Sequence, residues 1–458
     1  MTSRQINKYR FYCNTEATYK YVWSETPPTT CPTSNVHSID TNSLTILDNI
    51  TEAASIIRGK MLGSNYDAGV TTDGRLMVDV PISAFGLLKM QQESPDIQIM
   101  FPYGISTLAT TSSTTGSGSV TWANSLANIA SGAATNSSGK LVSNRFFKYA
   151  PGQGANIMMT ALFDAPAAGN NRIIGIGNVS NGFFYGYNGT SFGILHRSNG
   201  VDTWIPKTSW NVDQMDGTGP SLQTLNLAVG NVFRINFQWL GFGAITFFIE
   251  ESTTGRFMLV HRIRYANLNS FTSVFDPSFP MYIQSANTTN ATSLSIRTPC
   301  FAAMLEGKRK FSGNPFSEDN TKSITTTTIT NVISIRCKTT FNGLTHYIPV
   351  SLASINICNT GQRTAVIYII KAPTVGGTPS WTSINANESV MEIDTAGTTV
   401  TGGIQYAAFP MQAGASQSFD LSSLNLYLEP GQTIVMGARL TTNGTNEVTV
   451  SITWLEDR

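Results

Sequence analysis

The feature that most constrains this chain is an alternation of apolar and other residues between positions 231 and 263. Large side chains recur at every second position in three short runs, which are Phe233, Ile235, Phe237 and Trp239, then Ile245, Phe247 and Ile249, then Phe257, Leu259, His261 and Ile263, and all but His261 are apolar. Successive residues of a strand point to opposite faces, so this period predicts an antiparallel meander with one apolar face. Such a face needs a second sheet to cover it, and the sequence therefore favours a β-sandwich.

A hairpin is expected just before this meander. Residues 182–195 are rich in aromatic side chains, which fit a half-buried pleated surface. Asn188-Gly189 interrupts them, and both residues tolerate positive φ. The pattern predicts two short strands joined by a tight turn at this pair.

Four segments of this region resemble a module that recurs in virion fibre and tail proteins of tailed phages and large DNA viruses. They are residues 182–197 (GFFYGYNGTSFGILHR), 210–221 (WNVDQMDGTGPS), 238–243 (QWLGFG) and 259–267 (LVHRIRYAN). The similarity extends over roughly residues 140–310. It implies a virion surface protein on a head fibre, tail fibre or baseplate, whereas the periodicity by itself predicts only β structure.

The opening of the chain carries a second, independent resemblance to such fibre proteins, in residues 11–16 (FYCNTE), 22–25 (VWSE) and 28–32 (PTTCP). Residues 11–23 also read as two short strands around Asn14-Thr15-Glu16. The opening segment, residues 1–60, buries too little apolar surface to be stable alone. We expect it to anchor the protein on its particle through Phe11, Tyr12, Tyr21 and Trp23; the alternative is an edge hairpin of the next domain.

The chain as a whole is predicted to be all-β, with an N-terminal anchor followed by two β-sandwiches of jelly-roll or lectin-like type. The expected parts are an anchoring segment (1–60), a β-rich connecting region (61–140), a central lectin-like sandwich (141–311) and a C-terminal sandwich (320–458). Residues 109–118 are expected to form a flexible Ser/Thr/Gly loop, residues 123–130 a helical turn or two, and residues 76–80 a strand. Residues 332–335, 353–357, 365–370, 433–438 and 448–454 read as strands, with a turn at 428–432.

The composition and net charge of the chain limit the classes of partner that it is expected to bind. Only 12% of residues are charged, the net charge is +1, and no long basic run exists, so nucleic-acid binding is not expected. No stretch approaches the roughly 18 apolar residues of a membrane span, and residues 1–8 lack the apolar core of a signal peptide. We therefore expect assembly in the host cytoplasm, residence in the virion and no membrane insertion.

Motifs for catalysis are absent from the sequence. His37, His196, His261 and His346 stand in no catalytic or metal-binding motif, and we expect structural roles for His196 and His261. The adjacent pair Glu250-Glu251 would point to opposite faces of a strand, which does not suit a glycosidase. We expect no catalytic residues, no cofactor and no enzyme activity.

The chain has five cysteines, an odd number at low density, which excludes a disulfide scaffold. Cys13 and Cys31 flank turns and lie near His37 in the sequence. Three states remain open for this pair: free buried thiols, a disulfide, or a zinc site for which only three ligands are visible. No metal site is predicted.

A sugar-binding surface is the one ligand site that the sequence suggests. Tyr185, Tyr187, Trp204 and Trp210 would stack on pyranose rings, and Asp213 and Asp216 would bind hydroxyl groups. The alternatives are that the rings fill the core between the sheets and that the two aspartates hold a loop or a calcium ion.

The expected function is therefore a structural fibre or tail protein of a phage or large DNA virus. It would form a homotrimer, bind other virion proteins through its N-terminal segment, and attach the particle to a host glycan or receptor. The alternatives are a tail-associated glycan-degrading enzyme and a cellular lectin-like module.

Overall fold

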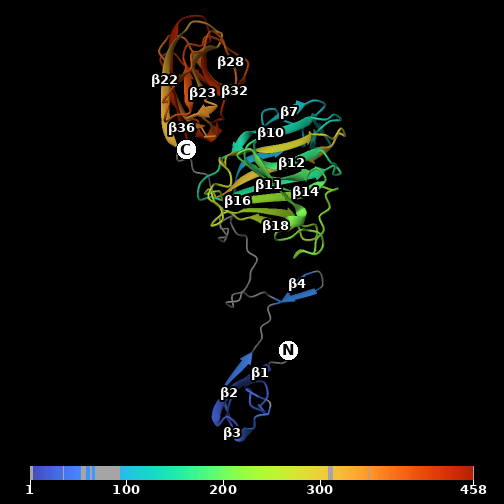
Figure 1. Ribbon diagram of the computed structural model, residues 1–458. Helices are drawn as coiled ribbons and strands as arrows, with labels where there is room; N and C mark the ends of the chain where they lie inside the picture. The colour runs from blue at the N-terminus through green and yellow to red at the C-terminus, as the bar shows by residue number, and fades with distance from the viewer. Residues whose placement is uncertain are drawn as a thin grey trace. The chain divides into compact units, whose positions relative to one another are not determined.

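The computed structural model describes residues 4–34, 36–52, 58–61, 64–67, 93–307, 313–348 and 350–456. The chain divides into two compact units, Met1–Pro81 and Ile82–Arg458. Within the described residues the only helical segments are two 3-10 turns, η1 (Lys207–Ser209) and η2 (Ser422–Leu424), and all other elements are strands (Figure 1). The predicted all-β class is confirmed. No helix in these ranges has the length and apolarity needed to cross a membrane.

The first unit contains a three-stranded antiparallel sheet in the order β2-β1-β3, made of β1 (Arg4–Cys13), β2 (Thr18–Ser24) and β3 (Ile39–Glu52). The β1–β2 hairpin predicted around Asn14-Thr15-Glu16 is confirmed. Its core is small and consists of Tyr9, Phe11, Cys13, Cys31 and Ile39. A second hairpin follows, β4 (Arg58–Met61) with β5 (Ser64–Asp67). The strand predicted at 76–80 lies outside the described residues.

The central sandwich in the second unit has two antiparallel sheets. The seven-stranded sheet runs β15 (Val201–Pro206), β14 (Ser191–Ser198), β13 (Gly182–Asn188), β12 (Asn170–Gly177), β19 (Phe279–Asn287), β10 (Ser138–Phe147) and β7 (Thr110–Thr115). The nine-stranded sheet runs β18 (Phe257–Ile263), β17 (Ile245–Glu250), β16 (Asn231–Phe237), β11 (Ala155–Phe163), β20 (Ser295–Thr298), β9 (Leu126–Ala130) and β8 (Ser119–Ala123), with β21 (Cys300–Glu306) between β11 and β6 (Glu93–Met100).

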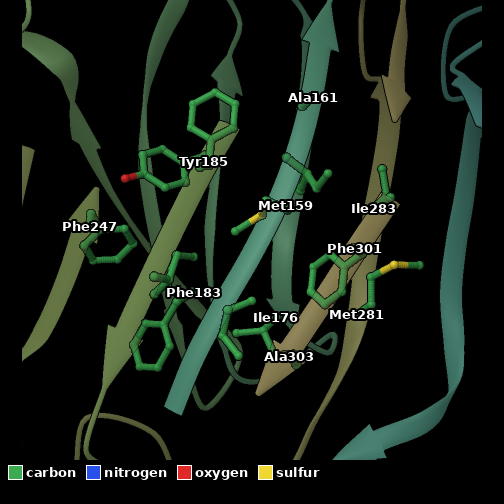
Figure 2. Packing of buried hydrophobic residues seen from close by; sticks show 14 of the residues in the cluster. Met159, Ala161, Ile176, Phe183, Tyr185, Phe247, Met281, Ile283, Phe301 and Ala303 are labelled. Atoms are coloured by element: carbon green, nitrogen blue, oxygen red, sulfur yellow. The ribbon is translucent and has the colours of Figure 1, made fainter. Parts of the chain in front are cut away.

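The meander predicted at 231–263 is β16, β17 and β18. Phe233, Ile235 and Phe247 of β16 and β17 are completely buried between the sheets, as the alternation requires. Figure 2 shows Phe247 packing in this core beside Tyr185 of the opposite sheet. A bulge opposite Phe247 and Phe248 adds one residue to β18, and the buried residues there are the consecutive pair Val260 and His261.

The predicted hairpin at 182–195 is β13 and β14. Asn188 pairs with Ser191, so the two-residue turn is Gly189-Thr190, one position later than expected. Gly189 alone takes a positive φ, of 62°.

Two local predictions between 109 and 130 are wrong. The expected flexible loop forms strand β7, because its threonines favour extended backbone and pair along β10. The expected helical turns form the β8–β9 hairpin, in which Asn124 and Ser125 both take positive φ, as in a two-residue I′ turn. Strands β6 to β9 therefore belong to the central sandwich, and the boundary predicted at 141 lies too late in the chain.

The C-terminal sandwich has a five-stranded and a six-stranded sheet. The first contains β22 (Asn314–Ile324), β36 (Asn446–Glu456), β26 (Val350–Asn359) and β33 (Ser416–Asp420), with β34 (Tyr427–Leu428) beside β26. The second runs β29 (Thr382–Ser383), β30 (Met391–Asp394), β23 (Thr330–Cys337), β35 (Thr433–Leu440), β27 (Ala365–Lys371) and β32 (Ile404–Met411). Two small ribbons complete it, β24 (Thr340–Phe341) with β25 (Leu344–Thr345) and β28 (Thr374–Val375) with β31 (Val400–Thr401).

All five runs predicted as strands in this part of the chain are strands, namely β23, β26, β27, β35 and β36. The turn predicted at 428–432 is closed by a hydrogen bond from the Gln432 N–H to the Glu429 carbonyl, and Gly431 takes a positive φ of 81°. The domain begins at Asn314, before the predicted boundary at 320, because β22 pairs with the last strand, β36.

Candidate functional site

Three of the four rings predicted to stack on sugars lie in the core of the central sandwich. Tyr185 is completely buried, and Tyr187 and Trp210 are 6% and 3% exposed. The Tyr185 ring lies 4.7 Å from that of Phe233 in the opposite sheet, and its hydroxyl donates to the Phe248 carbonyl at 3.1 Å. A ring enclosed in this way has no free face for a pyranose, so the stacking role predicted for these three residues is wrong and the core alternative holds.

The two aspartates predicted to bind hydroxyl groups hold a loop instead. Asp213 is 3% exposed, and its two carboxylate oxygens accept hydrogen bonds of 2.7 Å from the backbone N–H groups of Met215 and Ser221. Asp216 is exposed and accepts from the N–H and hydroxyl of Thr218. Both carboxylates thus satisfy backbone donors of the same loop, which supports the loop alternative.

The adjacent glutamates lie at the end of β17 and in the turn that follows it. Glu250 ends β17 at a half-buried position, and the Glu251 carboxylate accepts from the N–H groups of Thr253 and Thr254 in the turn that follows. Glu251 therefore fixes the turn between β17 and β18.

Trp204 is the one predicted ring that lies elsewhere. It packs on the face of the seven-stranded sheet that points away from the core, against a second apolar cluster. We call this cluster the outer-face patch, and its residues are Val142, Ile173, Phe184, Leu195, Trp204 and Tyr282. Leu195 pairs with Trp204 and also with Phe184, so one large side chain comes from each of three neighbouring strands.

Glycines make room for this patch. A Cβ on Gly175 would lie 2.9 Å from the Phe184 ring, and one on Gly177 would lie 2.5 Å from it. The Phe184 ring therefore packs directly against β12 at these two glycines, and it also lies 5.7 Å from the Tyr282 ring and 5.5 Å from the guanidinium of Arg197. The patch has a signal in the sequence: within each strand, Phe184, Leu195 and Trp204 occupy positions that alternate with those of the core residues and so point to the opposite face.

Polar groups border the outer-face patch. Arg197 forms a two-point ion pair with Asp202, at 2.6 Å and 3.0 Å. The Tyr282 hydroxyl donates to Gln284 Oε1 at 2.8 Å, and the Lys140 ammonium lies 6.0 Å from the Tyr282 ring. Sequence reasoning did not select these groups, because strands β10 and β19, which carry Lys140, Tyr282 and Gln284, lie far in the chain from the β14–β15 hairpin. Phe184 and Tyr282 are themselves 0% and 4% exposed, so Trp204 is the ring of the patch that can meet a polyhydroxylated ligand beside these donors and acceptors.

The histidines of the central sandwich have structural partners, which confirms the prediction for both. His196 Nε2 lies 2.6 Å from the Ser273 carbonyl, and His261 Nδ1 accepts from the Asn211 N–H at 3.2 Å. Burial lowers the pKa of both imidazoles, that of His261 to about 4. His346 in the C-terminal sandwich is held in the same way, with Nε2 2.8 Å from the Lys338 carbonyl.

The four residues predicted to anchor the protein divide between core and surface. Phe11 is completely buried, and Tyr12 is half-buried. Tyr21 and Trp23 are 56% and 43% exposed, and Tyr19, which was not predicted as an anchor residue, is 51% exposed. Tyr19, Tyr21 and Trp23 alternate along β2, so they form one row on one face of the sheet, which we call the β2 aromatic row.

Cations from β1 lie against the β2 aromatic row. The Lys8 ammonium is 5.9 Å from the Tyr21 ring and 5.6 Å from the Trp23 ring. The Arg10 guanidinium is 5.1 Å from the Tyr19 ring. These contacts follow from the β1–β2 register, in which Lys8 is opposite Trp23 and Arg10 is opposite Tyr21. The result is an exposed aromatic and basic surface on a very small domain.

No protein-family model matches the chain, and no curated protein sequence matches it. Solved structures with some similarity include the carbohydrate recognition domain of Emp47p, at 10% identity over 47% of this chain and 98% of that chain, with a TM-score of 0.30. A β-1,3-glucanase from Mycobacterium marinum is 12% identical over 46% of this chain and 100% of its own, also with a TM-score of 0.30. The cellulose-induced protein Cip1 is 11% identical over 45% of this chain and 96% of its own, at the same TM-score. These descriptions belong to those proteins, and the β-sandwich fold of this chain rests on its own strands and sheets.

Proposed function

We propose that the protein is a structural component of a virion, a fibre or tail protein of a phage or large DNA virus, that attaches the particle to its host. In this account the N-terminal sheet docks on another virion protein, and the central sandwich binds a cell-surface glycan. The observation that carries the proposal is the β2 aromatic row, three large rings exposed on a domain with a five-residue buried core. The two sequence resemblances to viral fibre proteins support it.

The β2 aromatic row has the character of a protein docking surface. Tyr and Trp, with a cation nearby, are the residues that most often dominate binding energy at protein interfaces. Strand β2 is also an edge strand of its sheet, so its outer backbone groups are open to a further strand. A partner that covers the row would bury apolar surface that the isolated domain leaves in water.

The outer-face patch supports the second half of the proposal. Trp204 is partly exposed and offers an apolar ring, while Arg197, Asp202 and Gln284 offer donors and acceptors beside it. In the account proposed here this site binds and does not cleave, since Asp213, Asp216 and Glu251 each bind backbone N–H groups of their own loops. A homotrimer, as such fibres form, would give three copies of the site and raise the avidity of attachment.

Docking is tested by measuring incorporation into particles of the virus that encodes the chain. Trp23→Ala combined with Tyr21→Ala is expected to lower incorporation at least tenfold and to leave the central sandwich folded. The matched control is Tyr103→Ala, which removes a ring that is 97% exposed in the second unit. Normal incorporation of the double variant would contradict the docking role.

Glycan binding is tested on a glycan array with the full chain. Trp204→Ala is expected to lower the bound signal at least tenfold, and Trp122→Ala, which removes a 45% exposed ring on β8, is expected to leave it unchanged. The same glycans are then assayed for release of smaller sugars. Turnover that disappears in Glu250→Ala or Asp213→Ala would favour the alternative of a glycan-degrading tail enzyme.

A further inference from the structure

The tip of the N-terminal sheet gathers four side chains of metal-ligating type: Cys13, Glu16, Cys31 and His37. One potential ligand atom of each lies within 4.8 Å of all the others. Cys13 and Cys31 are buried, and Glu16 and His37 are half-buried. The sequence shows only three of these ligands as a group, because Glu16 is brought in by the turn between β1 and β2.

Backbone pairing holds the four residues together. Cys13 ends β1 and pairs with Ile39 at the start of β3, which places the hairpin turn next to the connector that carries Cys31 and His37. The Asn14 N–H donates to the Ser38 carbonyl at 3.0 Å. Within the connector, Cys31 forms a β-bridge with Ser34, and the His37 N–H donates to the Ser34 carbonyl at 3.1 Å. The cluster is therefore fixed by the fold of the sheet.

The structure assigns these four side chains as a tetrahedral zinc site, which we propose as a structural metal centre of the N-terminal unit. A set of two thiolates, an imidazole and a carboxylate binds zinc in preference to calcium or magnesium, which favour oxygen ligands alone. In a tetrahedral zinc site neighbouring ligand atoms lie about 3.3–3.8 Å apart, which is inside the spread of this cluster. Four protein ligands leave no open position, so the site is structural and not catalytic.

The surroundings of the cluster fit a bound divalent cation. Two thiolates and one carboxylate exceed the charge of Zn²⁺ by one, and the Lys20 ammonium lies 2.5 Å from Glu16 Oε2. Thr33 Oγ1 is 3.0 Å from Cys31 Sγ, and Glu16 Oε1 is 3.1 Å from His37 Nδ1. Such contacts orient ligands and tune their affinity for the metal.

A bound metal would also stabilise this small domain. Two of its five buried core residues are the cysteines themselves. Domains with so small a core usually need a metal or disulfides, and the free energy of metal binding then becomes folding free energy. A Cys13–Cys31 disulfide would use only two of the four residues and would give no role to His37 or Glu16.

The test begins with the full chain purified under reducing conditions without chelator. Elemental analysis is expected to find one zinc per chain. After the zinc is removed, titration with Co²⁺ alone is expected to produce the visible bands of tetrahedral cobalt and its thiolate charge-transfer band, saturating at one equivalent. Cys13→Ser, Cys31→Ser and His37→Ala are expected to lose the stoichiometric metal. Cys300→Ser, which changes an exposed cysteine of β21, is the matched control and is expected to retain it.

A milder variant keeps the test decisive if a cysteine variant does not fold. Glu16→Gln retains both thiols and is expected to bind zinc about 10–100-fold more weakly, as changes at or next to a metal ligand do. Hydrogen exchange in β1–β3 should rise when a chelator is added to the wild-type chain, with no change in the two sandwiches. The proposal is overturned if the reduced chain takes up neither zinc nor cobalt at one equivalent. It is also overturned if Cys13→Ser binds as well as wild type, or if alkylation trapping in cells finds Cys13 and Cys31 joined as a disulfide.

Discussion

Lys148 and Glu429 form an ion pair in which Nζ and Oε2 are 2.7 Å apart and the two side chains are only 5% and 7% exposed. Lys148 directly follows β10 of the central sandwich, and Glu429 lies in the turn after β34 of the C-terminal sandwich. The Lys148 ammonium also donates to the Tyr347 carbonyl at 3.3 Å. Because both charges are removed from water, the stability of the second unit is sensitive to the loss of either partner.

Glu429→Gln is expected to destabilise the second unit by about 3 kcal/mol, because it removes the carboxylate that pairs with the buried Lys148 ammonium. In a thermal scan of the full chain this should lower the midpoint by about 5 °C or more. Replacing both partners, in Lys148→Met with Glu429→Leu, should recover most of the loss, since it removes both buried charges. A double variant less stable than Glu429→Gln would contradict this account of the pair.

The buried histidines predict a loss of stability in acid. His261 has its pKa lowered by burial to about 4, whereas in the unfolded chain an imidazole has a pKa of about 6.5. Above pH 6.5 neither state binds the proton. Between pH 6.5 and 4 the unfolded state binds it and the folded state does not, so stability falls as the pH falls.

The measurement for this prediction is the thermal midpoint of the central sandwich at several values between pH 7.5 and 4.5. His261→Gln, which keeps an acceptor near the Asn211 N–H, should be less stable at neutral pH and should show a flatter decline. His196, whose pKa is also lowered by burial, leaves part of the slope in place. An unchanged slope in His261→Gln would show that this imidazole does not contribute.

The loop closed by Asp213 is expected to depend on both of its carboxylate oxygens. Asp213→Asn turns one acceptor into a donor that faces a backbone N–H group, at a cost of about 1–3 kcal/mol. Gly219→Ala should open the same loop, because the new Cβ would lie 2.2 Å from Asp213 Oδ1. Asp216→Asn is the control on an exposed residue and should cost little. Hydrogen exchange of residues 213–224 reports all three, and equal effects of Asp213→Asn and Asp216→Asn would contradict the assignment.

The strands were predictable where the signal is local. The alternation that gave β16 and β17 lies within single strands, where neighbouring residues are enough to reveal it. Strand β7 was missed because Ser and Thr are equally common in loops, and its pairing with β10 depends on residues 23 to 33 positions away.

The sites were harder to predict, for two physical reasons. In β13 both faces carry aromatic rings, so parity alone did not decide whether Tyr185 or Phe184 points into the core. The outer-face patch and the cluster around Cys13 are assembled from strands and turns distant in sequence, through registers that a single sequence does not reveal. The β2 aromatic row was partly visible, since Tyr21 and Trp23 alternate within one strand.

The central claim, that this is a virion protein whose N-terminal sheet docks on the particle, is tested most directly by quantitative mass spectrometry of purified virions of the encoding virus. The account predicts peptides of this chain in stoichiometric amounts in wild-type particles, and at least a tenfold loss with Tyr21→Ala and Trp23→Ala. Absence of the chain from purified wild-type particles would contradict it.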